Sequence, residues 1–184
     1  MESITELKNE HSGVKTMLGI IEAILTRSAN GREVNVDDLN EILEFLTVFV
    51  DRCHHGKEED FLFPALESAG LSRDQSHIGE LLQEHEQGRQ LVAGLRDVAN
   101  NFKIADQTVA GKLEKAGREY VALLKEHIQK EENVLFPMAE DMLGEEKDAE
   151  LAEAFEKVER ERVGPGKHEE FHELLHRLEQ TYTG

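Results

Sequence analysis

The sequence predicts an all-α protein: an up-down-up-down four-helix bundle with a C-terminal helical extension. Apolar residues recur every three or four positions along most of the chain, which is the spacing of an amphipathic helix. Of the 184 residues, 33% are charged and only 5% are aromatic, a composition that suits helices better than sheet strands. Four long predicted helices joined by short connections favour antiparallel packing in a bundle.

The first two helices are predicted from apolar spacing and from capping residues. The first helix is expected over about residues 4–25. Asn35 or Asp37 can cap the second helix, which is expected to run to about Leu66. Pro64 is expected to kink the last turn of this helix, because proline has no backbone N–H to donate.

The remaining helices complete the bundle and form the extension. The third helix is expected to start at Ser72, and the fourth to cover about residues 106–142. We therefore expect a bundle over residues 1–143 and an extension over residues 144–184. The last helix of the extension, about residues 167–180, is too short to fold alone and should pack on the bundle.

Charge and composition exclude several kinds of partner. A formal net charge of −18 repels phosphate backbones and anionic membrane surfaces, so we expect neither nucleic acid nor membrane as a partner. The N-terminus lacks the basic and apolar regions of a secretory signal, and no stretch approaches the roughly 18 apolar residues of a membrane span. The single cysteine, Cys53, cannot form an internal disulfide, which fits a reducing compartment. We expect a soluble, cytoplasmic protein.

The strongest pattern is an internal repeat. Residues 54–64, HHGKEEDFLFP, match residues 127–137, HIQKEENVLFP, at seven of eleven positions and an offset of 73. Upstream, residues 6–11, ELKNEH, resemble residues 80–85, ELLQEH, at an offset of 74. Two matches at nearly the same offset indicate a pair of helices that the chain uses twice.

The repeated residue types are those of a metal site. In HxxxE the histidine and the glutamate lie on one helix face, with β-carbons about 5–6 Å apart. Two such helices and two EH helices supply four imidazoles and two carboxylates, which two cations would neutralise. Six ligands are too many for one tetrahedral zinc, whereas imidazoles and bridging carboxylates suit two irons. The candidate ligands are His11, His54, Glu58, His85, His127 and Glu131.

The first copy of the motif has two possible registers. Both His54 with Glu58 and His55 with Glu59 have the HxxxE spacing. Aligning the two copies on Leu-Phe-Pro selects His54 and Glu58. His55 and Glu59 are then expected to point about 100° around the helix, away from the metals.

HxxxEExxLFP occurring twice, each copy preceded by an EH-bearing helix, resembles the bacterial type of the hemerythrin-like (HHE cation-binding) family. The resemblance covers about residues 1–143. It implies a non-haem di-iron centre in a four-helix bundle, with two histidines on each iron and with carboxylate and oxo or hydroxo bridges. By position, the histidine pairs are His11 with His54 and His85 with His127, and the bridging residues are Glu58 and Glu131.

The chain departs from the oxygen-carrying hemerythrins in two places. Those proteins have a fifth histidine one turn before the one that matches His85, where this chain has Leu81. They also use an aspartate at longer spacing where this chain has Glu131. The resemblance is therefore to bacterial hemerythrin-like proteins rather than to oxygen transporters.

Further histidines and lysines are open to more than one interpretation. His168, His172 and His176 form a stripe on the last predicted helix, which we interpret as a docking helix. In the alternative, His168 or His172 closes the mouth of the site, as an extra ligand or a hydrogen-bonding gate. Lys57 and Lys130, which recur in the repeat, are interpreted as balancing local acid on an exposed face.

The leading functional hypothesis is a di-iron protein that binds, senses or processes O2, NO or peroxide. Six ligands, two of them bridging, leave open positions on two six-coordinate metals. The alternative is an iron-storage or iron-sensing regulatory module, in which metal occupancy controls folding or partner binding. The sequence contains no nucleophile–base pair, phosphate loop or cofactor fingerprint, so we assign no catalytic residue and disfavour a hydrolase or transferase.

Overall fold

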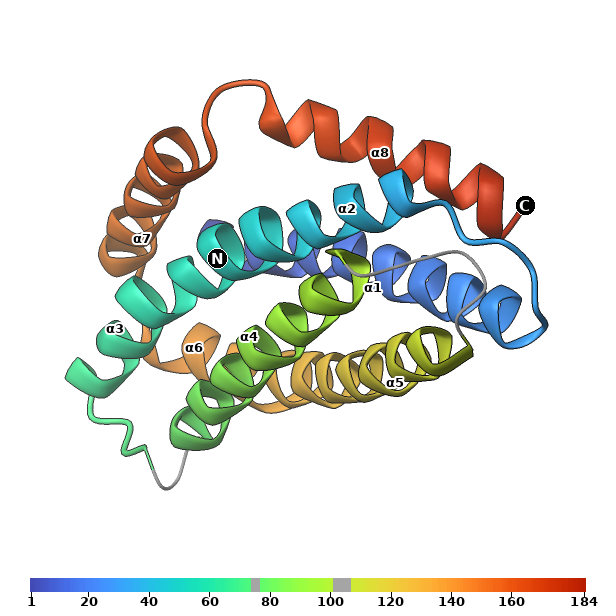
Figure 1. Cartoon of the computed structure of the whole chain (residues 1–184). Coiled ribbons are helices and arrows are strands. Elements are labelled where there is room, and N and C mark those ends of the chain that lie inside the picture. Colours follow the sequence, from blue (N-terminus) through green and yellow to red (C-terminus); the bar gives the residue numbers. More distant parts are fainter. Residues whose placement is uncertain (74–76, 101–106) are drawn as a thin grey trace.

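The computed structural model describes residues 1–73, 77–100 and 107–184, and within these ranges every regular element is a helix (Figure 1). This confirms the predicted all-α class. The α-helices are α1 (Glu2–Ala29), α2 (Val36–Phe45), α3 (Phe63–Ser68), α4 (Ile78–Asn100), α5 (Gln107–Lys130), α6 (Phe136–Met142), α7 (Glu145–Val158) and α8 (Lys167–Tyr182). The wider π-helical segments are η1 (Leu46–His55), η2 (Glu58–Leu62), η3 (Glu131–Leu135) and η4 (Glu159–Val163).

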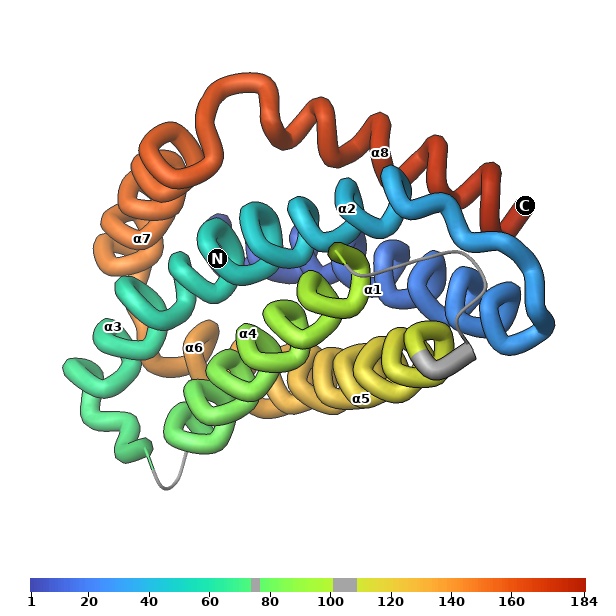
Figure 2. The backbone as a smooth tube through the Cα atoms, in the orientation of Figure 1, coloured from blue at the N-terminus to red at the C-terminus, as the bar shows by residue number. Residues whose placement is uncertain are grey.

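Several of these elements follow one another without a break, so that they form longer helices. The backbone is helical from α2 through η1 and η2 to α3, and again from α5 through η3 to α6 (Figure 2). The helix α4 begins at Ile78, so the predicted start at Ser72 is wrong; Ser72 lies outside regular structure. The predicted start of the fourth helix, Asp106, lies outside the described residues.

Each proline of the repeat follows a π-helical turn. The N–H of Phe63 donates to the carbonyl of Glu58, and that of Phe136 donates to the carbonyl of Glu131, which are bonds across five residues. Proline has no N–H, and its ring would clash with a carbonyl of an ordinary α-turn. A wider turn removes that clash, so both helices continue past their prolines. Pro64 thus distorts the helix, as expected, and the distortion is this π-helical turn.

Two apolar clusters lie on either side of a polar layer. The long helices pass from one cluster, through this layer, into the other. On α1, for example, Leu7 belongs to the second cluster, His11 to the polar layer and Val14 to the first cluster. On α5 and η3 the same order is seen in reverse, from Leu124 to Leu135. The site is therefore enclosed along the helix axes by packed hydrocarbon.

The last helices lie against α1. The side chains Phe171 and Leu178 of α8 are buried in the first cluster, and Phe155 of α7 is buried in the second. The chain reverses between η4 and α8 at Gly164 and Gly166, which have φ angles of 94° and 84°. Residues with a Cβ rarely adopt positive φ, so glycine suits both positions. No helix of the described residues is long and apolar enough to span a membrane.

Candidate metal centre

The structure brings all six predicted ligand residues together in the polar layer. They come from four long helices, and none is more than 2% exposed. They are His11 on α1, His54 in η1, Glu58 at the start of η2, His85 on α4, His127 on α5 and Glu131 at the start of η3. Their role as ligands remains a prediction, but their common location is a property of the fold.

The ligand atoms of these residues form two overlapping groups, and within each group all of them lie within 4.8 Å of one another. Each group contains one histidine pair, and both contain the same two glutamates. The groups are His11, His54, Glu58 and Glu131, and His85, His127, Glu58 and Glu131. This is the arrangement of two adjacent cation sites with shared carboxylates.

Each shared glutamate lies between one histidine of each pair. Glu131 is 3.1 Å from Nε2 of His11 and 3.2 Å from Nε2 of His127. For Glu58 the distances to the other histidine of each pair are 3.7 and 3.5 Å. A carboxylate in this position can give one oxygen to each of two cations.

The outward nitrogen of each imidazole meets a further glutamate. An ionised carboxylate can only accept a hydrogen bond, so Nδ1 carries the proton and donates it. Nε2 is then unprotonated, and its lone pair is directed to the centre. The four bonds are His11 to Glu132 at 3.1 Å, His54 to Glu10 at 2.7 Å, His85 to Glu59 at 2.7 Å and His127 to Glu84 at 3.0 Å. Metal-bound histidines are typically oriented in this way.

Sequence reasoning missed these four glutamates, although the repeat contains a signal for each. Glu10 and Glu84 are the first residues of the two EH pairs, and Glu59 and Glu132 are the second residues of the two EE pairs. Each glutamate binds a histidine on another helix. Spacing within one helix could not reveal such a contact.

The two lysines of the repeat hold two of these glutamates. Lys57 is fully buried, and its Nζ lies 2.5 Å from Glu6, 2.5 Å from Glu10 and 2.7 Å from Glu159. Lys130 pairs in the same way with Glu80 and Glu84 and is half-buried. The interpretation of Lys57 as a residue of an exposed face is therefore wrong. Its ammonium offsets the charge of a buried carboxylate behind His54.

Among the described residues, every buried side-chain nitrogen or oxygen without a hydrogen-bond partner belongs to this layer. These atoms are Nε2 of His11 and His54, both ring nitrogens of His55, and both carboxylate oxygens of Glu58 and Glu131. Buried polar atoms are normally paired, and an unpaired buried carboxylate is especially costly. Imidazole nitrogens and carboxylate oxygens are ligands that iron accepts, so the residues fit a pair of iron ions.

Without a cation, protons take over the charge balance of the layer. Burial, together with repulsion from Glu131, raises the pKa of Glu58 well above its usual value. Burial also opposes ionisation of Glu131, but His127 and His11 outweigh it and lower its pKa well below the usual value. Burial disfavours charged His127, yet Glu131 and Glu84 raise its pKa to about 9. Metal binding would displace these protons.

His55 does not point away from the site as expected. It is 4% exposed, and its ring stacks on that of His85 with centroids 3.8 Å apart. The expectation of a 100° offset assumed an α-helix, whereas His55 ends a π-helical segment with more residues in each turn. Glu59 is also not remote, because it accepts the Nδ1 proton of His85.

The C-terminal histidines lie outside the two ligand groups. His168 lies 3.5 Å from Glu159 and 4.0 Å from Cys53, and its ring meets Phe49 edge to face. His172 lines a cavity of about 670 Å³ beside α1 and α8. Neither histidine belongs to the groups that share Glu58 and Glu131. The alternative in which one of them closes the site gains no ligand contact from the described residues.

Fold and site together define an all-helical protein with two groups of histidine and glutamate side chains that could hold cations. Residues 2–139 match the family model of the hemerythrin HHE cation binding domain, and the chain belongs to this family. The family resemblance inferred from the repeat is thereby confirmed.

The chain is also similar to uncharacterized proteins of Mycobacterium bovis and Mycobacterium tuberculosis. It is 27% identical to each of them over 159 residues, which is 86% of this chain. The match covers 62% of the length of these relatives, so they contain sequence that this chain does not match. No solved structure matches this chain.

Proposed function

We propose that this chain is a non-haem di-iron protein that binds, senses or processes O2, NO or peroxide. The observation that carries the proposal is the pair of ligand groups that share Glu58 and Glu131. Two adjacent cations need carboxylates between them, whereas a single structural zinc takes four ligands. Membership of a cation-binding family supports the same proposal.

The proposal includes an up-down-up-down bundle over residues 1–143, an extension over residues 144–184 and a cytoplasmic location. The four long helices that carry the six residues support the bundle. Cys53 is free and buried, which fits a reducing compartment. Burial raises the pKa of its thiol to about 12, so Cys53 stays protonated and does not compete as a thiolate ligand.

The residues of the chain would orient the ligands and keep bulk water away from the centre. The four outer glutamates fix the tautomer of each imidazole, and the apolar clusters close the layer on two sides. When bound, an iron pair supplies a one-electron change at each metal and open positions for a small ligand.

The burial of the centre favours small ligands. A cavity of about 280 Å³ between η1 and α4 is lined by Asp51, His55 and Arg89 among others. Because the six ligand residues are almost fully buried, a bulky substrate could not reach them without unfolding the layer. A diatomic molecule or peroxide fits this restriction.

The second candidate function is an iron-storage or iron-sensing module whose occupancy controls folding or partner binding. One contact favours it: Glu159 of η4 binds Lys57, which also binds Glu10 behind His54. The polar layer is thus joined to the C-terminal segment by the ion pairs of Lys57 and the hydrogen bond between Glu10 and His54. Limited proteolysis of that segment tests this candidate. Protection only with iron would support it, and equal cleavage with and without iron would contradict it.

Anaerobic loading with iron(II), followed by exposure to oxygen, tests the main proposal. Metal stoichiometry and an absorption spectrum are recorded on the same sample. We expect two irons per chain, and a reversible oxygen band would indicate binding or sensing. Irreversible conversion to the ferric form would indicate oxidase-like chemistry. A stoichiometry near zero would sink the proposal.

A matched pair of variants makes the loading experiment specific. We predict that Glu131→Gln loses at least one iron per chain, because a neutral amide neither bridges two cations nor offsets their charge. Glu126→Gln removes the same charge from an exposed position of α5 and should load like the parent protein. Equal loading of the two variants would contradict the bridging role of Glu131.

A further inference from the structure

His55 is a buried histidine with no hydrogen bond. Both of its ring nitrogens lack a partner, and Nδ1 is 3.7 Å from the carboxylate of Asp51, beyond hydrogen-bonding distance. Buried polar side chains are rarely left unpaired in this way. In the described part of the chain, the other buried polar side-chain atoms without partners all belong to the predicted ligands. His55 therefore shares the feature that marks the metal site.

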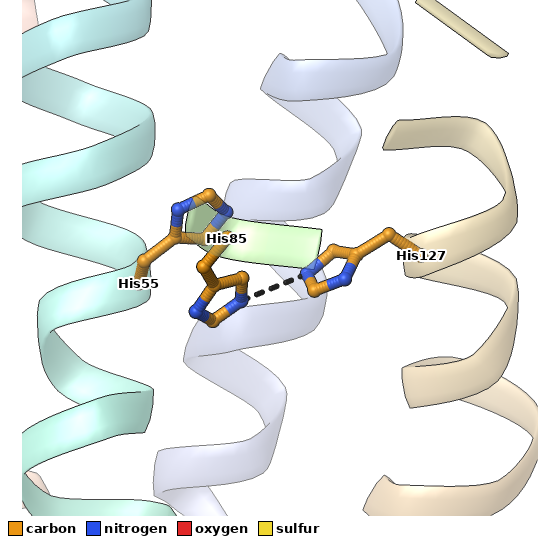
Figure 3. A group of neighbouring side chains, drawn as sticks. All are labelled: His55, His85 and His127. Atoms are coloured by element: carbon orange, nitrogen blue, oxygen red, sulfur yellow. Dashed lines mark hydrogen bonds between the residues drawn. The ribbon is translucent and has the colours of Figure 1, made fainter. Parts of the chain in front are cut away.

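The position of His55 is that of a ligand to one of the two metals. The ligand atoms of His55, His85 and His127 lie within 4.8 Å of one another, with the ring of His55 stacked on that of His85 (Figure 3). Two nitrogens bound to one metal at about 2.1 Å each can be at most about 4.2 Å apart. His55 would complete a three-histidine set by turning its ring out of the stack on His85, so that one nitrogen points to the metal.

The contact between His85 and His127 also requires a cation. Their Nε2 atoms are 3.0 Å apart (Figure 3), although both Nδ1 atoms already bond to glutamates. If both Nδ1 atoms carry protons, the two Nε2 lone pairs face each other. A proton or a metal ion between them removes this repulsion. The nitrogens of His55 thus lie close to a point where positive charge is needed.

We propose that His55 is an additional ligand to the metal held by His85 and His127, so that the two metal sites are unequal. With the bridging glutamates, that metal has five protein ligands and the metal at His11 and His54 has four. The repeat itself supports this difference, because the residue that matches His55 in the second copy is Ile128, which cannot ligate.

This inference rests on the proposed function, since it assumes that the layer holds two irons. Two variants test it without relying on activity. His55→Phe keeps a flat ring that can stack on His85 but has no nitrogen. His55→Ile places in the first copy the residue that the second copy has, and it serves if the phenylalanine variant fails to fold. Circular dichroism checks that the helices are retained.

The readouts are the Mössbauer spectrum of protein loaded anaerobically with 57Fe(II) and the stepwise affinity for iron(II). For the parent protein we expect two quadrupole doublets of equal area. Loss of His55 should change one doublet, leave the other in place and weaken one of the two binding steps by about tenfold or more. Exchange of an exposed histidine, His176→Phe, should change neither readout.

The outcomes separate this inference from the proposed function. If the parent protein takes up no iron, the proposed function fails and the inference fails with it. If the parent protein binds two irons but the His55 variants give the same doublets and affinities, only the inference is overturned. His55 would then be a wall residue of the cavity between η1 and α4.

Discussion

We expect the single glutamate that accepts the Nδ1 proton of each histidine to affect how tightly the layer binds a metal. Glu84 accepts the Nδ1 proton of His127 and is itself bound by Lys130. We predict that Glu84→Gln weakens iron(II) binding by about 10- to 100-fold, because a neutral amide leaves the imidazole less basic. Anaerobic titration measures the affinity. The control is Glu86→Gln on the exposed face of α4, and a loss of the same size there would contradict the prediction.

The two lysines of the repeat give a second comparison between matching residues. Lys57 is fully buried among three carboxylates, whereas Lys130 is half-buried with two. We predict that Lys57→Met lowers the free energy of unfolding by about 3–5 kcal/mol, because it leaves Glu10 as a buried charge without its ammonium counter-ion. Lys130→Met should lower the free energy of unfolding clearly less, because water can reach the carboxylates in place of its ammonium. Urea unfolding measures both, and equal losses would show that burial of Lys57 does not matter.

The helices show where sequence reasoning succeeded and where it failed. An HxxxE spacing correctly places His54 and Glu58 on one face, because a four-residue step is about one turn in either kind of helix. The orientation of His55 depends on the number of residues in each turn, and η1 departs from the α-helical value. Residue patterns do not specify such a segment. The prediction of a shared helix face was therefore right for His54 and Glu58, and the predicted orientation of His55 was wrong.

The helix α8 gives a prediction at the same scale. Phe171 is 4% exposed and meets the rings of Phe45 and Phe49 at 5.3 and 5.9 Å. We predict that Phe171→Ala lowers the free energy of unfolding by about 3–5 kcal/mol, since it opens a cavity in the first apolar cluster. Thermal and urea unfolding measure the loss. The exposed residue His172, next to it in sequence, should tolerate alanine, and a comparable loss there would argue against packing as the cause.

In the whole molecule, the repeat made most of the architecture predictable from sequence. An offset of 73 or 74 between the two copies required two equivalent helix pairs, and it identified the six residues that the fold brings together. Contacts between helices were not predictable, because no pattern within one helix shows that Glu10 faces His54 or that Glu159 reaches Lys57. These contacts depend on how the helices are rotated and aligned.

Metal binding and folding should be linked through the protons of the layer. In the absence of metal, the pKa of His127 is about 9 in the folded protein against an ordinary value of 6.5. Folding therefore favours its charged form, and this contribution is complete below pH 6.5 and is lost as the pH rises through 9. Burial raises the pKa of Glu10 from 4.5 to about 7. Glu10 therefore also lowers the stability of the folded protein as the pH rises from 4.5 to 7.

We therefore predict that metal-free protein becomes less stable by the order of a few kcal/mol between pH 6.5 and 9. Protein loaded anaerobically with iron(II) should gain stability over the same range, because metal and protons compete for the same imidazoles and carboxylates. Urea unfolding of both forms across this range measures how the free energy of unfolding of each form changes with pH. Slopes of the same sign would mean that the metal does not bind in the layer where these protons are held, which would contradict both the site and its function.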